Sequence, residues 1–109
     1  MDAERIAHTA LHGWHTRVEG AASIEEVVDT VQDFVASLTP SDVIYLPSDC
    51  RPGRIHDESD IDYWNLTLAE ACKAQWGTNR DCELLVEVAQ IFLRASVRVS
   101  RLTEAAAHP

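Results

Sequence analysis

The chain has 109 residues, of which 46% are hydrophobic and 25% are charged; these values indicate one compact globular domain and exclude a disordered chain. Eighteen acidic residues against nine basic ones leave a net charge of −9, so we expect no direct binding to nucleic acid, which requires a face that neutralises phosphates. The expected partners are proteins with a basic surface, or cations.

No segment predicts a membrane helix or an export signal. The apolar runs are far shorter than the roughly 18 residues that a span needs, and residues 1–5 lack the basic flank and apolar core of a signal peptide. Cys50, Cys72 and Cys82 include no CxxC pair, so neither a disulfide framework nor a structural zinc site is predicted. We therefore expect a cytoplasmic protein that makes no membrane contact.

The first predicted helix covers about residues 2–19, where apolar residues recur at steps of three and four. His8, His12 and His15 fall at i, i+4 and i+7, so they share one edge of this helix and can hold a zinc or nickel ion. The HExxH pattern is absent, and a solvated edge explains the same spacing. Metal binding by these histidines stays an alternative, and the first expectation is no cofactor.

The second predicted helix covers about residues 23–38. Ser23 and Glu26 form a capping box in which the Ser23 hydroxyl accepts from the amide of Glu26 and the carboxylate reaches back to the amide of Ser23. Apolar residues then follow one face without a gap until Pro40 ends the helix. This helix has the strongest pattern in the chain.

A loop with several prolines is predicted for residues 39–58, in which only residues 43–46 form a regular apolar run. We expect this run to be extended and to lie across the helices, or to form a strand with a second subunit. Cys50 stands beside Arg51 and near Arg54, which would lower the pKa of an exposed thiol. Against redox or nucleophilic use of Cys50, the sequence positions no histidine partner apart from the nearby His56.

Two further helices are predicted for about residues 59–75 and 80–104, joined as a hairpin. The last helix is apolar around most of its circumference, so we expect it to be central or to form the seam of a homodimer. The residues assigned to that dimer interface follow a heptad-like spacing: Leu85, Val88, Phe92, Val99 and Leu102. The chain is therefore predicted to be all-α, a four-helix bundle or an orthogonal helical array.

One basic stripe, made of Arg94, Arg98 and Arg101, is predicted on the exposed side of the last helix. It either attracts an acidic surface, such as that of a second copy of this chain, or stabilises the C-terminal end of its own helix. Both interpretations stay open.

The acidic excess is concentrated between Val18 and Cys50, a segment with seven acidic residues and no basic one. The leading hypothesis is a small non-enzymatic interaction protein, an adaptor, regulator or inhibitor, that binds a basic protein surface through the helix at 23–38 and the loop after it. The predicted contact residues are Glu25, Glu26, Asp29, Asp33, Asp42 and Asp49. In size and charge the chain resembles small acidic proteins of phages and mobile elements, including some anti-CRISPR proteins, and this resemblance implies a nucleic-acid mimic.

A second hypothesis rests on Glu25, Glu26 and Asp29 together with Glu83 and Glu87. This pattern resembles all-α nucleotide pyrophosphohydrolases related to MazG, which hold magnesium with an EExxE motif and a later ExxD motif on facing helices. The resemblance implies a magnesium-dependent hydrolase with these five carboxylates as ligands. The second pair here is ExxxE and follows more than fifty residues later, and stabilisation of a helix N-terminus explains Glu25 and Glu26 without a metal.

Overall fold

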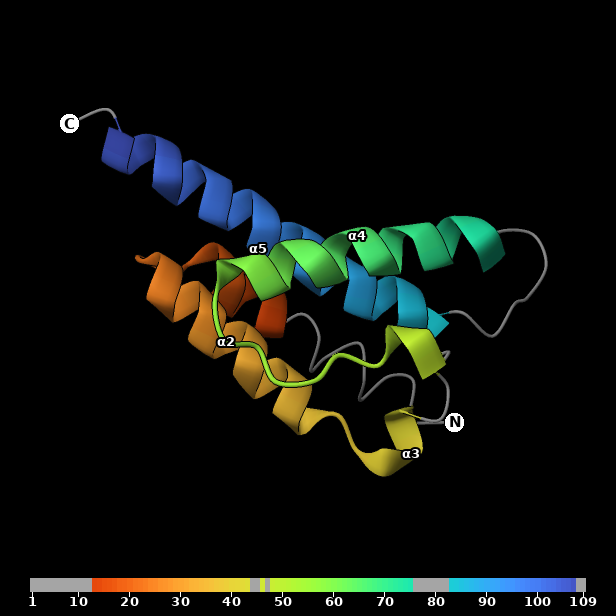
Figure 1. Ribbon diagram of the computed structural model, residues 1–109. Helices are drawn as coiled ribbons and strands as arrows, with labels where there is room; N and C mark the ends of the chain where they lie inside the picture. The colour runs from red at the N-terminus through yellow and green to blue at the C-terminus, as the bar shows by residue number, and fades with distance from the viewer. Residues whose placement is uncertain (1–12, 44–45, 47, 76–82, 108–109) are drawn as a thin grey trace.

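The computed structural model describes residues 13–43, 46, 48–75 and 83–107, and these residues contain helices and no strand (Figure 1). The all-α class predicted from the sequence is therefore confirmed. None of the described helices is long and apolar enough to cross a bilayer. In chain order, the described residues form a helical segment at 13–19, α2 (Ile24–Ser37), α3 (Pro40–Val43), the 3₁₀ turn η1 (Ser48–Cys50), α4 (Glu58–Gln75) and α5 (Glu83–Ala107).

The capping box at the start of α2 is present, with one difference from the expected pattern. The Ser23 hydroxyl accepts from the amide of Glu26 at 3.1 Å, as predicted, but Glu26 Oε2 accepts from the amide of Ala22 at 2.8 Å and not from that of Ser23. The Ser23 backbone is extended, which brings the preceding amide into reach of the carboxylate. Both side chains are therefore committed to the end of α2.

Residues 40–43 form the short helix α3, which corrects the expected extended run at its first residue, Val43. Pro40 occupies the first helical position, where its missing N–H and fixed φ are favourable. Thr39 and Asp42 cap each other: the amide of Asp42 donates to Thr39 Oγ1 at 3.1 Å and the amide of Thr39 donates to Asp42 Oδ2 at 2.9 Å. Residues 44 and 45 lie outside the described part, and Leu46 is buried in the core.

The chain between η1 and α4 runs along α2 before it enters α4 (Figure 1). Ile55 is buried, and its amide donates to Gln32 Oε1 on α2 at 2.6 Å. Asp57 then caps α4, because its Oδ1 accepts from the amide of Ser59 at 3.0 Å and from that of Asp60 at 3.4 Å. This cap explains why α4 begins at Glu58.

α5 is the central helix of the described chain, since it packs along α4 and also against α2. Of the residues expected at a dimer interface, Leu85, Val88, Phe92 and Val99 are buried within this one chain, and Leu102 is partly buried against the same core. The apolar pattern of α5 is used to pack its own neighbours. A surface that α5 offers to a second copy must therefore lie elsewhere on the helix.

Candidate interaction surfaces

One line of carboxylates follows the outer side of α2, opposite the side that buries Val27 and Phe34. Glu25, Asp29 and Asp33 lie at i, i+4 and i+8, and all three are exposed. Glu25 and Asp29 have no ion-pair partner among the described residues. We call these three residues the α2 acidic face.

Asp33 is the one member of the α2 acidic face with a described ion pair, to Arg17 Nη2 at 3.1 Å, and both side chains are more than half exposed. Arg17 also lies over the ring of Trp14, 4.6 Å from its centroid, and Trp14 contacts Phe34 edge to face at 5.7 Å. These contacts fix the helical segment 13–19 against α2. They also leave the opposite end of the face, at Glu25 and Asp29, available to a partner.

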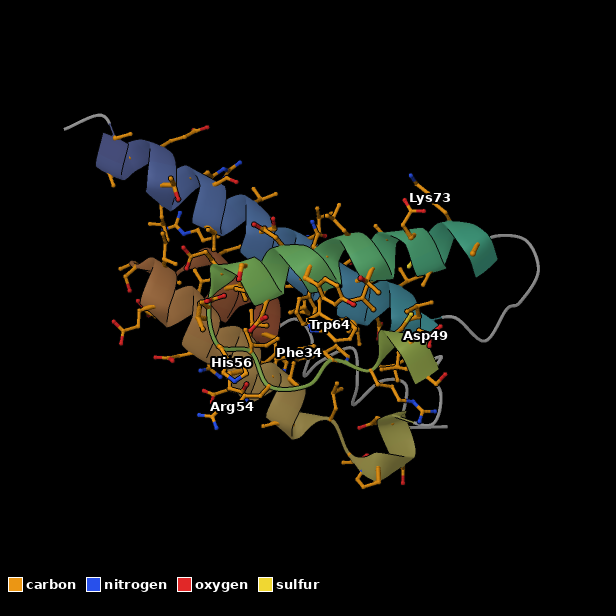
Figure 2. The ribbon with its side chains drawn as sticks, in the orientation of Figure 1. Phe34, Asp49, Arg54, His56, Trp64 and Lys73 are labelled. Carbon is orange, nitrogen blue, oxygen red and sulfur yellow. The ribbon has the colours of Figure 1, made fainter. Side chains whose placement is uncertain are left out.

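The other expected contact residues are placed differently. Glu26 and Asp42 cap their own helices, so their carboxylates are engaged within the chain. Asp49 is exposed on η1, and it lies well away from Arg54 and His56, which lie beside α2 (Figure 2). Asp42 and Asp49 therefore lie on other elements than α2, whereas Glu26 is exposed at i, i+3 and i+7 with Asp29 and Asp33 and shares this side of α2, although its carboxylate is engaged by the amide of Ala22.

An open groove of about 620 Å³ lies on α5. We call this hollow the α5 groove; it is lined by Glu19, Leu93, Arg94, Val97, Arg98 and Arg101. Leu93 and Val97 are 51% and 42% exposed although they are large and apolar. The sequence pattern predicted the arginines of this side but not the apolar pair between them.

The arginines of the α5 groove have different surroundings. Arg94 forms an ion pair with Glu19. Arg98 donates from Nε and Nη2 to the carbonyl oxygen of Ala21, at 2.9 and 2.7 Å. Arg101 is exposed, and no described residue pairs with it. One of the three guanidinium groups is thus structural, and the tertiary partners Glu19 and Ala21 carried no local sequence signal.

Of the three histidines predicted as metal ligands, only His15 has a described position, because His8 and His12 lie outside the described residues. His15 is half-buried in the helical segment 13–19. Within the described part of the chain, no group of three or more His, Cys, Asp or Glu side chains is arranged to hold a metal ion.

The carboxylates assigned to a magnesium site are distributed over two ends of the structure. Glu26 caps the start of α2, next to Ala21, which Arg98 of α5 contacts. Glu87 lies 11 residues before Arg98 in the sequence, or about 16 Å along the axis of α5 at 1.5 Å per residue. Neither carboxylate lines the α5 groove, and the side chain of Glu83 is outside the described part.

Cys50 is buried, so the condition for a lowered thiol pKa, exposure beside the arginines, is not met. Burial raises the pKa of its thiol, and the negative charge of Asp49 raises it further. Arg51, the neighbour expected to lower this pKa, instead donates from Nε to the carbonyl of Leu46 at 3.1 Å. The arginine holds the turn around η1, and the thiol packs as a small apolar side chain.

The chain matches no known family model, no curated protein sequence and no solved structure.

Proposed function

We propose that this protein is a small non-enzymatic interaction protein that binds a basic surface of another protein through the α2 acidic face. The observation that carries the proposal is the exposure of Glu25 and Asp29 without an ion-pair partner among the described residues. Positions four apart on a helix are separated by about 6 Å along its axis, so Glu25, Asp29 and Asp33 present a regular row of negative charge. Such a row attracts and orients a complementary basic partner.

Repulsion between the carboxylates of the α2 acidic face also supports this proposal. Like charges at i and i+4 destabilise a helix by about 0.2–0.5 kcal/mol per pair, and Asp29 faces a carboxylate on both sides, at Glu25 and Asp33. A lysine at position 29 would remove both repulsions. An arrangement that lowers stability at an exposed position is typical of a residue that serves binding.

A sharper form of the proposal is a nucleic-acid mimic, in which the α2 acidic face takes the place of a phosphate backbone in the groove of a nucleic-acid-binding protein. The support is the regular spacing of the carboxylates and the net charge of −9. The same proposal includes a cytoplasmic setting. It also includes a four-helix bundle in which α4 and α5 form a hairpin.

The test is capture of a partner by immobilised protein from an extract of its source cells. The proposal predicts a captured protein that wild type retains at low salt and that Asp29→Lys does not retain. Glu70→Lys is the matched control, because Glu70 is also an exposed acid in a helix and the change in net charge is identical. Equal capture by wild type and both variants would contradict the proposal. Competition by duplex DNA for the captured protein separates the mimic from other acidic binders.

A further inference from the structure

The exposed side of α5 carries a second surface that the α2 acidic face does not involve. Leu93 and Val97 lie four residues apart, side by side in the α5 groove, and about half of each side chain is exposed. Single exposed apolar residues are ordinary on a protein surface, but these two are neighbours in a hollow rimmed by arginines and form a local apolar patch.

The C-terminal end of α5 projects beyond the other described helices (Figure 1). From Ser100 to Ala107 the residues are exposed, with Leu102 as the partly buried exception. Two helical turns with so little packing are marginal in water, because most helical stability in proteins comes from tertiary contacts. A partner that covers these turns would therefore stabilise them.

The charge on the exposed side of α5 differs from that of the rest of the chain, and this difference bears on which partner can bind there. Two copies of a protein with net charge −9 repel each other over most of their surfaces. Residues 88–109 are the exception, since Arg94, Arg98 and Arg101 outnumber Glu104. Two α5 helices that face each other repel less than two acidic surfaces do, and they attract each other only in a register that opposes an arginine to Glu104.

The spacing on α5 also favours a second copy. Residues 94, 97, 101 and 104 follow each other at steps of three, four and three, so they lie on one side of the helix. In an antiparallel pair of such helices, Arg94 lies opposite Glu104 of the partner subunit, and Val97 lies opposite Arg101 of the partner subunit. A two-fold axis repeats both contacts, so no like charges in the row are opposed. A parallel pair would place Arg94 against its own counterpart.

We propose that two copies of this chain form a two-fold symmetric dimer through the exposed sides of α5, with the C-terminal turns of each copy lying in the α5 groove of the other. The aliphatic stem of Arg101 covers the partner's Val97, and its guanidinium stays in solvent. The buried residues of α5 take no part, because they remain in the core of each copy. This dimer does not depend on the partner of the α2 acidic face.

The test is the mass of the purified protein by sedimentation equilibrium over a wide range of concentration. The proposal predicts a reversible dimer of twice the 12.1 kDa chain mass. Arg94→Glu and Glu104→Arg each oppose like charges, so each is expected to raise the dissociation constant roughly tenfold or more. An equimolar mixture of the two variants restores both ion pairs, and a heterodimer as tight as the wild-type dimer is expected.

Leu66→Glu is the control, because Leu66 is 68% exposed but lies on α4. This variant is expected to dimerise as wild type does. Glu104 lies in the projecting turns, so Glu104→Arg tests the interface without disturbing the core, whereas Arg94→Glu also removes the ion pair with Glu19. A monomer at all concentrations would overturn the proposal, as would a dimer that Leu66→Glu dissociates, or variants that do not associate when mixed.

Discussion

Arg98 and Ala21 are joined across most of the chain, since Nε and Nη2 of the Arg98 side chain both donate to the carbonyl oxygen of Ala21, at 2.9 and 2.7 Å. Ala21 directly follows the turn that ends the helical segment 13–19, and it is fully buried. A charged fork therefore satisfies a carbonyl at the junction of three helical elements: the segment 13–19, α2 and α5. This bond makes Arg98 part of the fold, although the sequence places it in a surface stripe.

Replacing Arg98 by methionine is expected to lower the free energy of unfolding by about 1–3 kcal/mol, because it leaves the Ala21 carbonyl without its charged donors. Methionine keeps most of the aliphatic stem, so lost packing contributes little. Urea denaturation measures the change. The control is Arg101→Met, which should stay within about 0.5 kcal/mol of wild type because no described residue pairs with Arg101. Equal losses in both variants would show that the Ala21 contact is not stabilising.

Asp29→Lys is expected to stabilise the chain while it abolishes partner binding. The lysine replaces two like-charge contacts on α2 by favourable ones, to Glu25 before it and Asp33 after it, and the expected gain is about 0.5–1.5 kcal/mol. Thermal and urea denaturation at low salt report the gain, which should shrink when salt screens the charges. A variant that is less stable than wild type would contradict the assigned geometry of the α2 acidic face.

Stability should fall in acid as Asp57 is protonated. The hydrogen bond from the Ser59 hydroxyl lowers the pKa of Asp57, and the amides of Asp60 and Ser59 act in the same direction. Because the folded pKa lies below the unfolded value near 4, this contribution is complete above that value and is lost as the pH falls through the folded pKa. Asp57→Asn keeps an acceptor for the cap but does not titrate, so its denaturation midpoint should change less between pH 5 and pH 3 than that of wild type. An identical pH profile would contradict the cap.

Cys50 should react slowly with thiol reagents in the native protein. Its thiol is buried and its pKa is raised, so little thiolate is present and the reagent has little access. In a chain with Cys72→Ser and Cys82→Ser, labelling of Cys50 by iodoacetamide at pH 7 should rise steeply across the urea unfolding transition. Fast labelling without denaturant would show that the segment around η1 opens in the native state.

The features that could be predicted from the sequence are those that depend on residues close together in the chain. The helical class followed from apolar spacing, and the hydroxyl half of the capping box at Ser23 followed from the residue types alone. Residues 39–42 also carry local signals, since Thr39 and Asp42 form a reciprocal cap around Pro40, but the apolar run that begins at Val43 is a competing signal for an extended segment.

Tertiary partners explain what the sequence could not show. Nothing near Arg98 indicates the Ala21 carbonyl, and nothing near Cys50 indicates the burial that raises its pKa. The apolar series of α5 is equally compatible with a core or a dimer seam, and only the positions of α2 and α4 decide that Phe92 is core. The exposure of Leu93 and Val97 depends in the same way on where the neighbours of α5 lie.

The central claim is that charge on the α2 acidic face drives binding, and the most direct measurement is the dissociation constant of the captured partner for wild type, Asp29→Lys and Glu70→Lys at two salt concentrations. We predict that Asp29→Lys weakens binding at least tenfold at low salt, that Glu70→Lys leaves it within about twofold, and that added salt weakens the wild-type complex. Equal weakening by both substitutions would contradict the claim, because binding would then follow net charge and not the row formed by Glu25, Asp29 and Asp33.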